Sequence, residues 1–369
     1  MEIQTINTPA QFDRFIKFPW SIYKNDRNWV PPLLMDVKFN LKENPFWEHS
    51  ERELFMAYDN SGKPMGRIAA IVDHNYIRFH DEPVGFFGFY ESENNPVAAK
   101  ALFDKAGEWL KSKGIEMMRG PMNPSTNDEC GFLCEGFDEM PRLMMPYNPR
   151  YYLNLAEQCE LKKAKELYAY EMDISNGPIE RLKRIAEMAR KKNPGLIVRS
   201  LNMKDWEKEL QRALSVYNAA WEKNWAFVPW TKKEFMTVAT RMKSLFYPDT
   251  TLIAELGGKP VGLLIAVPDY NFVMKKMNGR LFPFGILKFM FYKNKIKALR
   301  LMIMGVVKEH RLRGIEGVMY YEALRNSLRK GFEKCEFSWI LDDNIMTQRG
   351  AEMMGGKLYK KYRIYERQL

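Results

Sequence analysis

Residues 304–317 read MGVVKEHRLRGIEG, and this stretch carries the chain from an apolar strand into a helix. The run LMIMGVV (301–307) predicts a strand, and IEGVMYYEALRNSLRKG (315–331) has the apolar spacing of a helix that ends at Lys-Gly. Basic side chains, Arg311 among them, stand before Gly314. The first N–H groups of a helix lack intrahelical partners and attract anions. The stretch therefore predicts a diphosphate-binding loop, or else an ordinary solvated loop before a helix.

Two further stretches resemble each other within the chain. GKPMGRIAAIVDHN (62–75) and GKPVGLLIAVPDYN (258–271) align without a gap, and each follows an apolar run. The Gly-Lys-Pro turn between apolar runs predicts a β-hairpin in both places. The first hairpin is followed by a predicted strand, helix and strand over 84–120, and the second by the same order over 301–341. The repeated order predicts a tandem duplication of one α/β unit.

A charged amphipathic pattern at 178–195 predicts a helix that links the two copies. We therefore expect a domain boundary near residue 176. The predicted domains are residues 1–176 and 177–369.

The composition restricts the class of protein. The chain has 369 residues, 46% of them hydrophobic and 28% charged, with a net charge of +11 that favours an anionic partner. The sequence shows neither a signal-peptide pattern nor an apolar run of the roughly 18 residues that a membrane span requires. Its four cysteines lack metal-site spacing. We expect free thiols in a cytoplasmic protein without a bound metal.

The stretch VVKEHRLRGIEG resembles the acyl-CoA-binding motif of the GCN5-related N-acetyltransferase superfamily, in which a strand, a basic loop with a central glycine and a helix hold the CoA diphosphate. Val306 matches the start of the motif, Arg311 its basic position and Gly314 its central glycine, while Glu316 occupies the last small position. The resemblance implies that acetyl-CoA or another acyl-CoA contacts ten residues. They are Val306, Val307, Arg311, Leu312, Arg313, Gly314, Ile315, Glu316, Gly317 and Asn344.

The next element resembles the same superfamily. In DDNIMTQRGAEMMGGKLY (342–359), Asn344 matches the asparagine that contacts the pantetheine arm, and Gly355 matches a late glycine. Thr347 and Ala351 stand where Ala and Tyr are usual. Over nearly its whole length the chain is also similar to bacterial proteins described as acetyltransferase-like. The resemblance implies an α/β (α+β) fold of two tandem acetyltransferase-like units, each a mixed, mostly antiparallel central sheet flanked by helices. The motif is legible only in the second unit.

The implied function is that of an acyl-CoA-dependent N-acyltransferase, which transfers an acyl group to an unknown small-molecule or peptide amine bound between the two units. Two alternatives stay open. One is a non-catalytic, ligand-binding descendant of the fold, because Glu316 repels a diphosphate and Ala351 lacks a phenol. The other is a peptidyltransferase that uses aminoacyl-tRNA. We assign no catalytic residue, since each candidate acid or base also suits an ordinary structural role; the candidates are Asp342, Asp343, Tyr320, Tyr321 and Glu255.

Two aromatic regions are open to two interpretations each. The cluster of Trp221, Trp225 and Trp230, together with Tyr151, indicates either a substrate pocket or rings packed over the core. The insertion at 272–300 mixes Phe, Leu and Met with Lys, which is typical of a segment that lies on a membrane surface or holds an acyl chain. The sequence favours the other interpretation of this insertion, a cover for the edge of the sheet.

Overall fold

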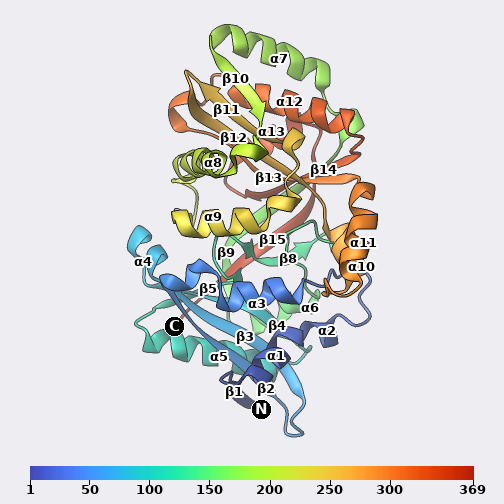
Figure 1. Ribbon diagram of the computed structural model, residues 1–369. Helices are drawn as coiled ribbons and strands as arrows, with labels where there is room; N and C mark the ends of the chain where they lie inside the picture. Colours follow the sequence, from blue (N-terminus) through green and yellow to red (C-terminus); the bar gives the residue numbers. More distant parts are fainter. The chain divides into compact units, whose positions relative to one another are not determined.

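The computed structural model describes residues 1–369 and divides the chain into two compact units (Figure 1). Unit 1 comprises Met1–Leu167, Val273–Phe291 and Lys360–Leu369, and unit 2 comprises Tyr168–Phe272 and Tyr292–Tyr359. The first segment of unit 1 ends close to the predicted boundary at residue 176. The return of two later segments to unit 1 has no signal in the sequence.

Unit 1 is built on a mostly antiparallel sheet that contains one parallel pair. The strand order is β1-β2-β3-β4-β5-β15, and only β4 and β5 run parallel. Its strands are β1 (Glu2–Thr5), β2 (Ser50–Tyr58), β3 (Pro64–Asp73), β4 (Val84–Ser92), β5 (Met117–Gly120), β6 (Met122–Asn123), β7 (Glu129–Cys130) and β8 (Phe132–Glu135). Its helices are α1 (Pro9–Lys17), α2 (Pro19–Ile22), α3 (Leu34–Lys42), α4 (His74–His80), α5 (Pro96–Ser112) and α6 (Tyr151–Gln158).

Unit 2 repeats this plan. Its strands follow the order β14-β13-β12-β11-β10, and only β13 and β14 run parallel. They are β10 (Leu196–Ser200), β11 (Thr251–Leu256), β12 (Lys259–Pro268), β13 (Ala298–Val306) and β14 (Lys334–Leu341). The helices are α7 (Ile179–Lys192), α8 (Trp206–Trp221), α9 (Lys232–Arg241), α12 (Ile315–Arg329) and α13 (Ile345–Met353). The unit boundary falls within β9 (Lys162–Asp173) and β15 (Lys357–Gln368), and the insertion forms α10 (Asn271–Met277) and α11 (Gly285–Tyr292).

The two aligned hairpins have the same strand pairing and the same close contact with a helix in both units. β2 pairs with β3, and β11 with β12, as predicted. A Cβ atom added to Gly66 would lie 2.7 Å from Leu102 of α5, and one added to Gly262 would lie 2.9 Å from Met319 of α12. The aligned glycines therefore let a helix approach the sheet closely in each unit.

The ends of both hairpins are also alike. Asp73 accepts a hydrogen bond from the backbone of Asn75 at the start of α4, and Asp269 accepts one from the backbone of Asn271 at the start of α10. The aligned Asp-x-Asn sequence thus begins a helix in both units. The predicted α/β (α+β) fold, with mixed, mostly antiparallel strands flanked by helices in each unit, is confirmed, whereas the origin by duplication stays a prediction.

Candidate functional site

In unit 2 the two parallel strands part before they end. Their pairing runs from Ala298 opposite Lys334 to Leu301 opposite Phe337, and no pair follows. β13 continues to Val306 paired with β12 alone, and its residues 302–305 are half-buried although three of them are Met or Ile. We call the place where the pairing stops the fork. It leaves a partly exposed apolar strand beside the start of α12.

The turn between β13 and α12 places bare helix amides at the fork. Gly314 is the N-cap residue of α12 with φ of 81°, and no side chain caps the helix. The first helical hydrogen bond runs from the amide of Val318 to the carbonyl of Gly314, at 3.2 Å. The amides of residues 315–317 therefore have no partner within the helix, and they form an anion-binding end.

Glu316 supplies an anion to this end from within the chain. Its half-buried carboxylate accepts a hydrogen bond from its own backbone N–H, and the charge of Arg311 also acts on it. Burial has the largest effect and raises the pKa of Glu316 above its ordinary value. A carboxylate of the chain itself thus lies at this helix end.

Arg311 holds the loop in shape. Its guanidinium donates to the carbonyl of Val306 at 3.0 Å and to the carbonyl of Ala220, at the end of α8, at 2.6 Å. Arg313 lies 3.1 Å from a ring nitrogen of His310, and the side chain of Leu312 is 90% exposed. The sequence predicted Arg311 as the basic position of an anion-binding loop, whereas in the structure its guanidinium is bound to two backbone carbonyls.

The small residues of the loop also have a packing role. A Cβ atom on Gly314 would lie 2.9 Å from Ala189 of α7, and one on Gly317 would lie 2.5 Å from Ile185. α7 therefore packs tightly against the start of α12. Of the other residues in the predicted contact set, Val306 and Ile315 are buried, and Val307 is bonded through its backbone to Val261 at 2.9 Å.

The next predicted contact, Asn344, caps a helix. Its side-chain oxygen accepts from the backbone of Thr347 at 3.2 Å and so begins α13. On the same helix, a Cβ atom on Gly350 would lie 3.5 Å from the hydroxyl of Tyr320. A phenol from α12 therefore reaches the residue next to Ala351, where the sequence lacks the expected tyrosine.

The other acid and base candidates lie in ordinary surroundings, with the exception of Tyr320. Burial, followed by the charge of Glu316, raises the pKa of this phenol. Glu255 is paired with Arg199 at 2.7 Å, and Tyr321 is covered by the guanidinium of Arg325 at 5.6 Å from its ring centre. Asp343 is exposed and Asp342 half-buried. Tyr320 is thus the candidate whose position relates to the fork.

The tryptophan cluster approaches the same strand. The ring of Trp221 would lie 2.4 Å from a Cβ atom on Gly305, so it rests on the backbone of β13. It also stacks on Tyr217 with ring centres 4.9 Å apart. Trp225 and Trp230 are half-buried, and the backbone of Trp230 bonds to Asn218. Tyr151 belongs to unit 1, where its hydroxyl donates to the carbonyl of Ser92 at 2.8 Å.

A buried polar network beside the fork was missed by the sequence analysis. Arg300 donates to the hydroxyl of Ser338 at 2.8 Å, and both Ser338 and Tyr359 bond to the carboxylate of Glu336, which is fully buried. The signal was present in CEFSW (335–339), where two polar residues alternate with apolar ones and so point to one face of the strand.

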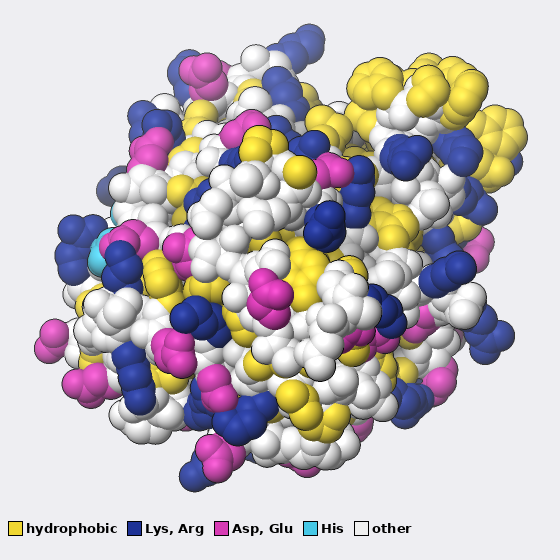
Figure 2. Space-filling view, turned by 90° about the horizontal axis from the view of Figure 1, so that it is seen from below, with side chains coloured by type: hydrophobic (Ala, Val, Ile, Leu, Met, Phe, Trp, Pro, Cys, Tyr) yellow, Lys and Arg dark blue, Asp and Glu magenta, His cyan; other side chains and the backbone are white.

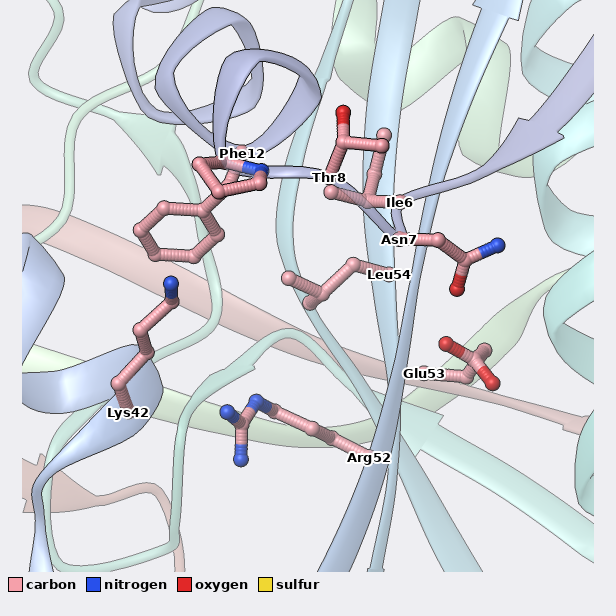
Figure 3. A pocket seen from close by; sticks show the side chains of 9 residues that line it. Ile6, Asn7, Thr8, Phe12, Lys42, Arg52, Glu53 and Leu54 are labelled. Carbon is pink, nitrogen blue, oxygen red and sulfur yellow. The ribbon is translucent and has the colours of Figure 1, made fainter.

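The residues that line a separate pocket in unit 1 were also not predicted. This pocket has a volume of about 410 Å³ and lies between the start of the chain and β2 (Figure 3). Lys42 points at the ring of Phe12, 3.9 Å from its centre, and Arg52 lies 4.3 Å from the ring of Trp47. Both cations are thus engaged with aromatic rings. None of the predicted site residues lines this pocket.

The structure contains neither a metal-binding group nor a membrane-spanning helix. No group of three or more His, Cys, Asp or Glu side chains is arranged to hold a metal ion. No helix has both the length and the apolar character needed to cross a membrane.

Two curated proteins are similar to this chain along its whole length. It is 33% identical over 377 residues to Protein YghO of Escherichia coli K12, with 100% of this chain and 95% of that protein covered. It is 32% identical over 382 residues to the bacterial ceramide synthase of Caulobacter vibrioides, with 100% and 98% covered. No protein-family model matches the chain.

Solved structures show the same fold at low sequence identity. A tandem GNAT protein from the clavulanic acid biosynthesis pathway matches 100% of this chain and 98% of its own, with a TM-score of 0.60 and 10% identity. A GCN5-related N-acetyltransferase from Sphaerobacter thermophilus matches 100% and 95%, at 0.53 and 11%. A GCN5-related glucosamine N-acetyltransferase region in a fungal β-N-acetylglucosaminidase matches 99% of this chain and 38% of its own, at 0.58 and 13%.

The resemblance first read from 304–317 and 342–359 is thus confirmed, both by relatives along the whole chain and by solved folds. The chain belongs to the family of Protein YghO and the bacterial ceramide synthase, and it has the fold of the GCN5-related N-acetyltransferases.

Proposed function

We propose that this protein is an N-acyltransferase that joins a long-chain acyl group, delivered as an acyl-CoA thioester, to the amino group of a long-chain amino alcohol. The observation that carries the proposal is the 32% identity, over the whole chain, to a protein named bacterial ceramide synthase. A ceramide is a fatty-acyl amide of a long-chain amino alcohol. We place the reaction in the cytoplasm, as expected from the sequence.

The start of α12 is the proposed donor site. The amides of residues 315–317 have no partner within the helix, and the positive φ of Gly314 lets the chain turn sharply into α12. Beside them, Met302 and Met304 share one face of β13, and their half-buried side chains give the fork an apolar wall. An anionic head and an apolar tail are the two features of an acyl-CoA, so the fork suits the thioester arm and the helix end suits the diphosphate.

Amide formation from a thioester needs two proton movements. The nitrogen of the amine attacks the thioester carbonyl, the C–S bond breaks, the nitrogen loses a proton and the thiolate gains one. We assign the second proton to Tyr320, whose hydroxyl lies near Gly350 and whose raised pKa keeps it protonated at neutral pH. The base that takes the proton from nitrogen is not assigned.

The proposed acceptor wall is aromatic. Trp221 rests on Gly305 of β13 and stacks on Tyr217, so an apolar ring surface lies along the strand that forms the fork. Such a surface suits an alkyl chain better than a charged peptide, because it offers contact area without polar partners. We therefore extend the predicted Trp221, Trp225 and Trp230 pocket to a lipid-like amine.

The test is product formation by purified protein, followed by mass spectrometry. The full chain is incubated with palmitoyl-CoA or acetyl-CoA, and with sphinganine or a short amino alcohol. We expect an N-acyl product only from the long-chain pair. Tyr320→Phe should lower kcat by roughly tenfold to a hundredfold with little change in KM, whereas Tyr321→Phe, its neighbour on α12, is the matched control and should retain activity.

The non-catalytic alternative makes a different prediction. The carboxylate of Glu316 on the helix amides favours it, because that carboxylate competes with a diphosphate. A protein of this kind would show thermal stabilisation by an acyl-CoA without any product, whatever amine is supplied. If no acyl-CoA gives either thermal stabilisation or product, both functions are excluded.

A further inference from the structure

The insertion that carries α11 exposes an unusual amount of apolar side chain. Five residues in and just before α11 are more than 60% exposed: Phe282 (68%), Phe284 (69%), Leu287 (61%), Met290 (61%) and Phe291 (62%). We call these five residues the apolar patch. The sequence favoured a cover over the sheet edge for this insertion, and that interpretation is wrong for the apolar patch, because its side chains face solvent.

The patch projects from a firmly held base. Val273 and Met277 of α10 are buried, and the turn after α10 makes two hydrogen bonds to the first segment of unit 1. The carbonyl of Gly279 accepts from the amide of Leu34 at 3.0 Å, and Asn278 accepts from the indole of Trp20 at 3.1 Å. α10 therefore fixes the segment, and α11 presents its side chains outward.

Three of the exposed apolar residues lie on one face of α11. Leu287, Met290 and Phe291 are spaced three and four residues apart, so they share one side of the helix. Gly285 is buried on another side, where an added Cβ atom would lie 2.1 Å from the carbonyl of Arg280. The close contact between Gly285 and the turn at Arg280 therefore fixes which face of α11 is turned toward solvent.

The insertion itself carries only basic charged side chains, one of which, Lys297, is paired with Glu333 at 3.4 Å. Residues 271–300 contain no Asp or Glu, and the exposed basic residues near the patch are Lys276, Arg280, Lys288, Lys293, Lys295 and Lys297. Figure 2 shows hydrophobic side chains gathered at its upper right, with Lys and Arg side chains beside them, on the side where Figure 1 draws α10 and α11. Exposed apolar anchors surrounded by cations match the interface of an anionic lipid bilayer.

The same charges argue against a second copy as the occupant. A two-fold contact places the same patch on both partners, so it would bring two sets of lysines together without any acidic residue from this segment to offset them. An anionic bilayer instead gains counter-charge and accepts the Phe side chains without a shaped pocket.

We propose that the apolar patch and its ring of basic residues form a reversible docking surface for an anionic membrane. The proposal rests on exposure and charge alone and holds whether or not the protein is an acyltransferase. If the proposed function is also right, docking brings the enzyme to bilayers that hold its lipid amine. The surface lies on the membrane and does not span it.

The test is co-sedimentation of the full chain with vesicles of phosphatidylcholine, with or without phosphatidylglycerol. We expect binding only when phosphatidylglycerol is present, and weaker binding as salt rises. The double variant Phe284→Ser/Phe291→Ser should bind at least about tenfold more weakly, because two large apolar side chains no longer leave water. Arg280→Glu/Lys293→Glu should lose most of the dependence on phosphatidylglycerol.

Matched controls separate docking from a general effect of surface hydrophobicity. Val97→Ser and Ile197→Ser change side chains that are 65% and 56% exposed elsewhere, and both should bind as the parent does. Unchanged melting temperature checks the fold of every variant. The proposal is overturned by a parent that stays in the supernatant, by a patch variant that binds as well as the parent, or by a parent dimer that the patch variant dissociates.

The assay also separates this proposal from the acyltransferase proposal. Vesicle binding is measured without substrates, so absence of product leaves it untouched. If both hold, the patch variant should keep its activity on detergent-dispersed amine and lose most of it on amine presented in vesicles. Equal loss on both substrates would show that the patch acts on the chemistry instead of docking, and would overturn the membrane assignment.

Discussion

The helices α5 and α12 occupy the same place in their units, yet they begin in different ways. The side chain of Asn95 accepts hydrogen bonds from the amides of Val97 and Ala98, and Pro96 has no N–H to offer. α12 begins at Gly314 without a side-chain cap. A side chain thus caps the amide end of the helix in unit 1, whereas the equivalent end in unit 2 has no side-chain cap.

The adjacent strands differ in the same sense. In unit 1, a Cβ atom on Gly88 of β4 would lie 1.8 Å from the carbonyl of Met122, and Asn123 accepts from the amide of Phe89 at 2.6 Å. The chain itself therefore lies against β4 just beyond its pairing with β5. In unit 2, β13 continues half-exposed past the fork. In unit 1, therefore, a side chain caps the start of the helix, and the chain itself fills the place where the parallel strands part.

The largest expected effect comes from separating β4 from the segment at Met122 that lies against it in unit 1. Gly88→Ala places a methyl group against the backbone of Met122, which has no side-chain freedom to yield. We expect a loss of more than about 4 kcal/mol in the free energy of unfolding, measured by urea denaturation. Gly62→Ala, at an open hairpin tip with φ of 80°, should cost only about 1 kcal/mol. Equal losses of stability in the two variants would show that the strain at a positive φ costs as much as the clash of the new methyl group with Met122.

The next effect concerns a buried ion pair next to that fork. Glu91 accepts from the hydroxyls of Tyr23 at 2.9 Å and Tyr152 at 2.7 Å, and it lies 3.9 Å from Arg67. Glu91→Gln leaves the guanidinium of Arg67 buried without its counter-charge, which should cost about 3–5 kcal/mol. Glu93→Gln, its more exposed neighbour, should change the stability by less than about 1 kcal/mol. A mild result at Glu91 would mean that Arg67 finds another partner.

In unit 2, Arg311→Gln tests whether the loop before α12 is the donor site. The change removes the hydrogen bonds to Val306 and Ala220, so the loop should loosen and acyl-CoA affinity should fall by at least about tenfold. Isothermal titration with palmitoyl-CoA measures it. Arg181→Gln on the exposed side of α7 is the matched control, and an unchanged affinity at Arg311 would remove the loop from the site.

A smaller change in the opposite direction is expected at Glu316. Glu316→Gln removes a negative charge from the amide end of α12, so acyl-CoA affinity at pH 7 should rise by about tenfold. Glu309→Gln in the same loop is the control. No gain would mean that the carboxylate turns away when the ligand binds.

The same variant has a defined pH dependence. Because burial raises the pKa of Glu316 in the folded protein above its ordinary value of 4.5, ionisation of this group opposes folding. The penalty is absent below about pH 4, grows as the pH rises from the ordinary pKa to the raised pKa of the folded protein, and reaches its full size above the latter. Glu316→Gln should therefore be more stable than the parent at pH 7 and equal to it near pH 4, as measured by thermal unfolding.

The smallest effect opens the capped helix of unit 1. Asn95→Ala removes the cap of α5 and should cost about 1 kcal/mol. It should create no affinity for acyl-CoA, since Pro96 still lacks an N–H and the chain still lies against Gly88. Measurable acyl-CoA binding in this variant, absent from the parent, would show that the cap alone closes the site.

The sequence by itself determined the repeated order of elements and the position of the loop. Apolar periodicity located β13, α12 and β14 within a few residues, because each has a simple period and a glycine at its turn. The Asp-x-Asn cap and the aligned glycines are local and contiguous, so the hairpins were legible too. The loop 304–317 stood out because a local motif contains all its parts.

Only the tertiary structure decided which groups are available there. It placed Arg311 on two carbonyls, one of them in α8, and it brought Tyr320 to Gly350 across two helices. It also showed that the apolar patch before and within α11 meets solvent, where the sequence pattern was compatible with burial. These facts depend on contacts between distant segments, and local periodicity records the face of an element but not the neighbour that covers it.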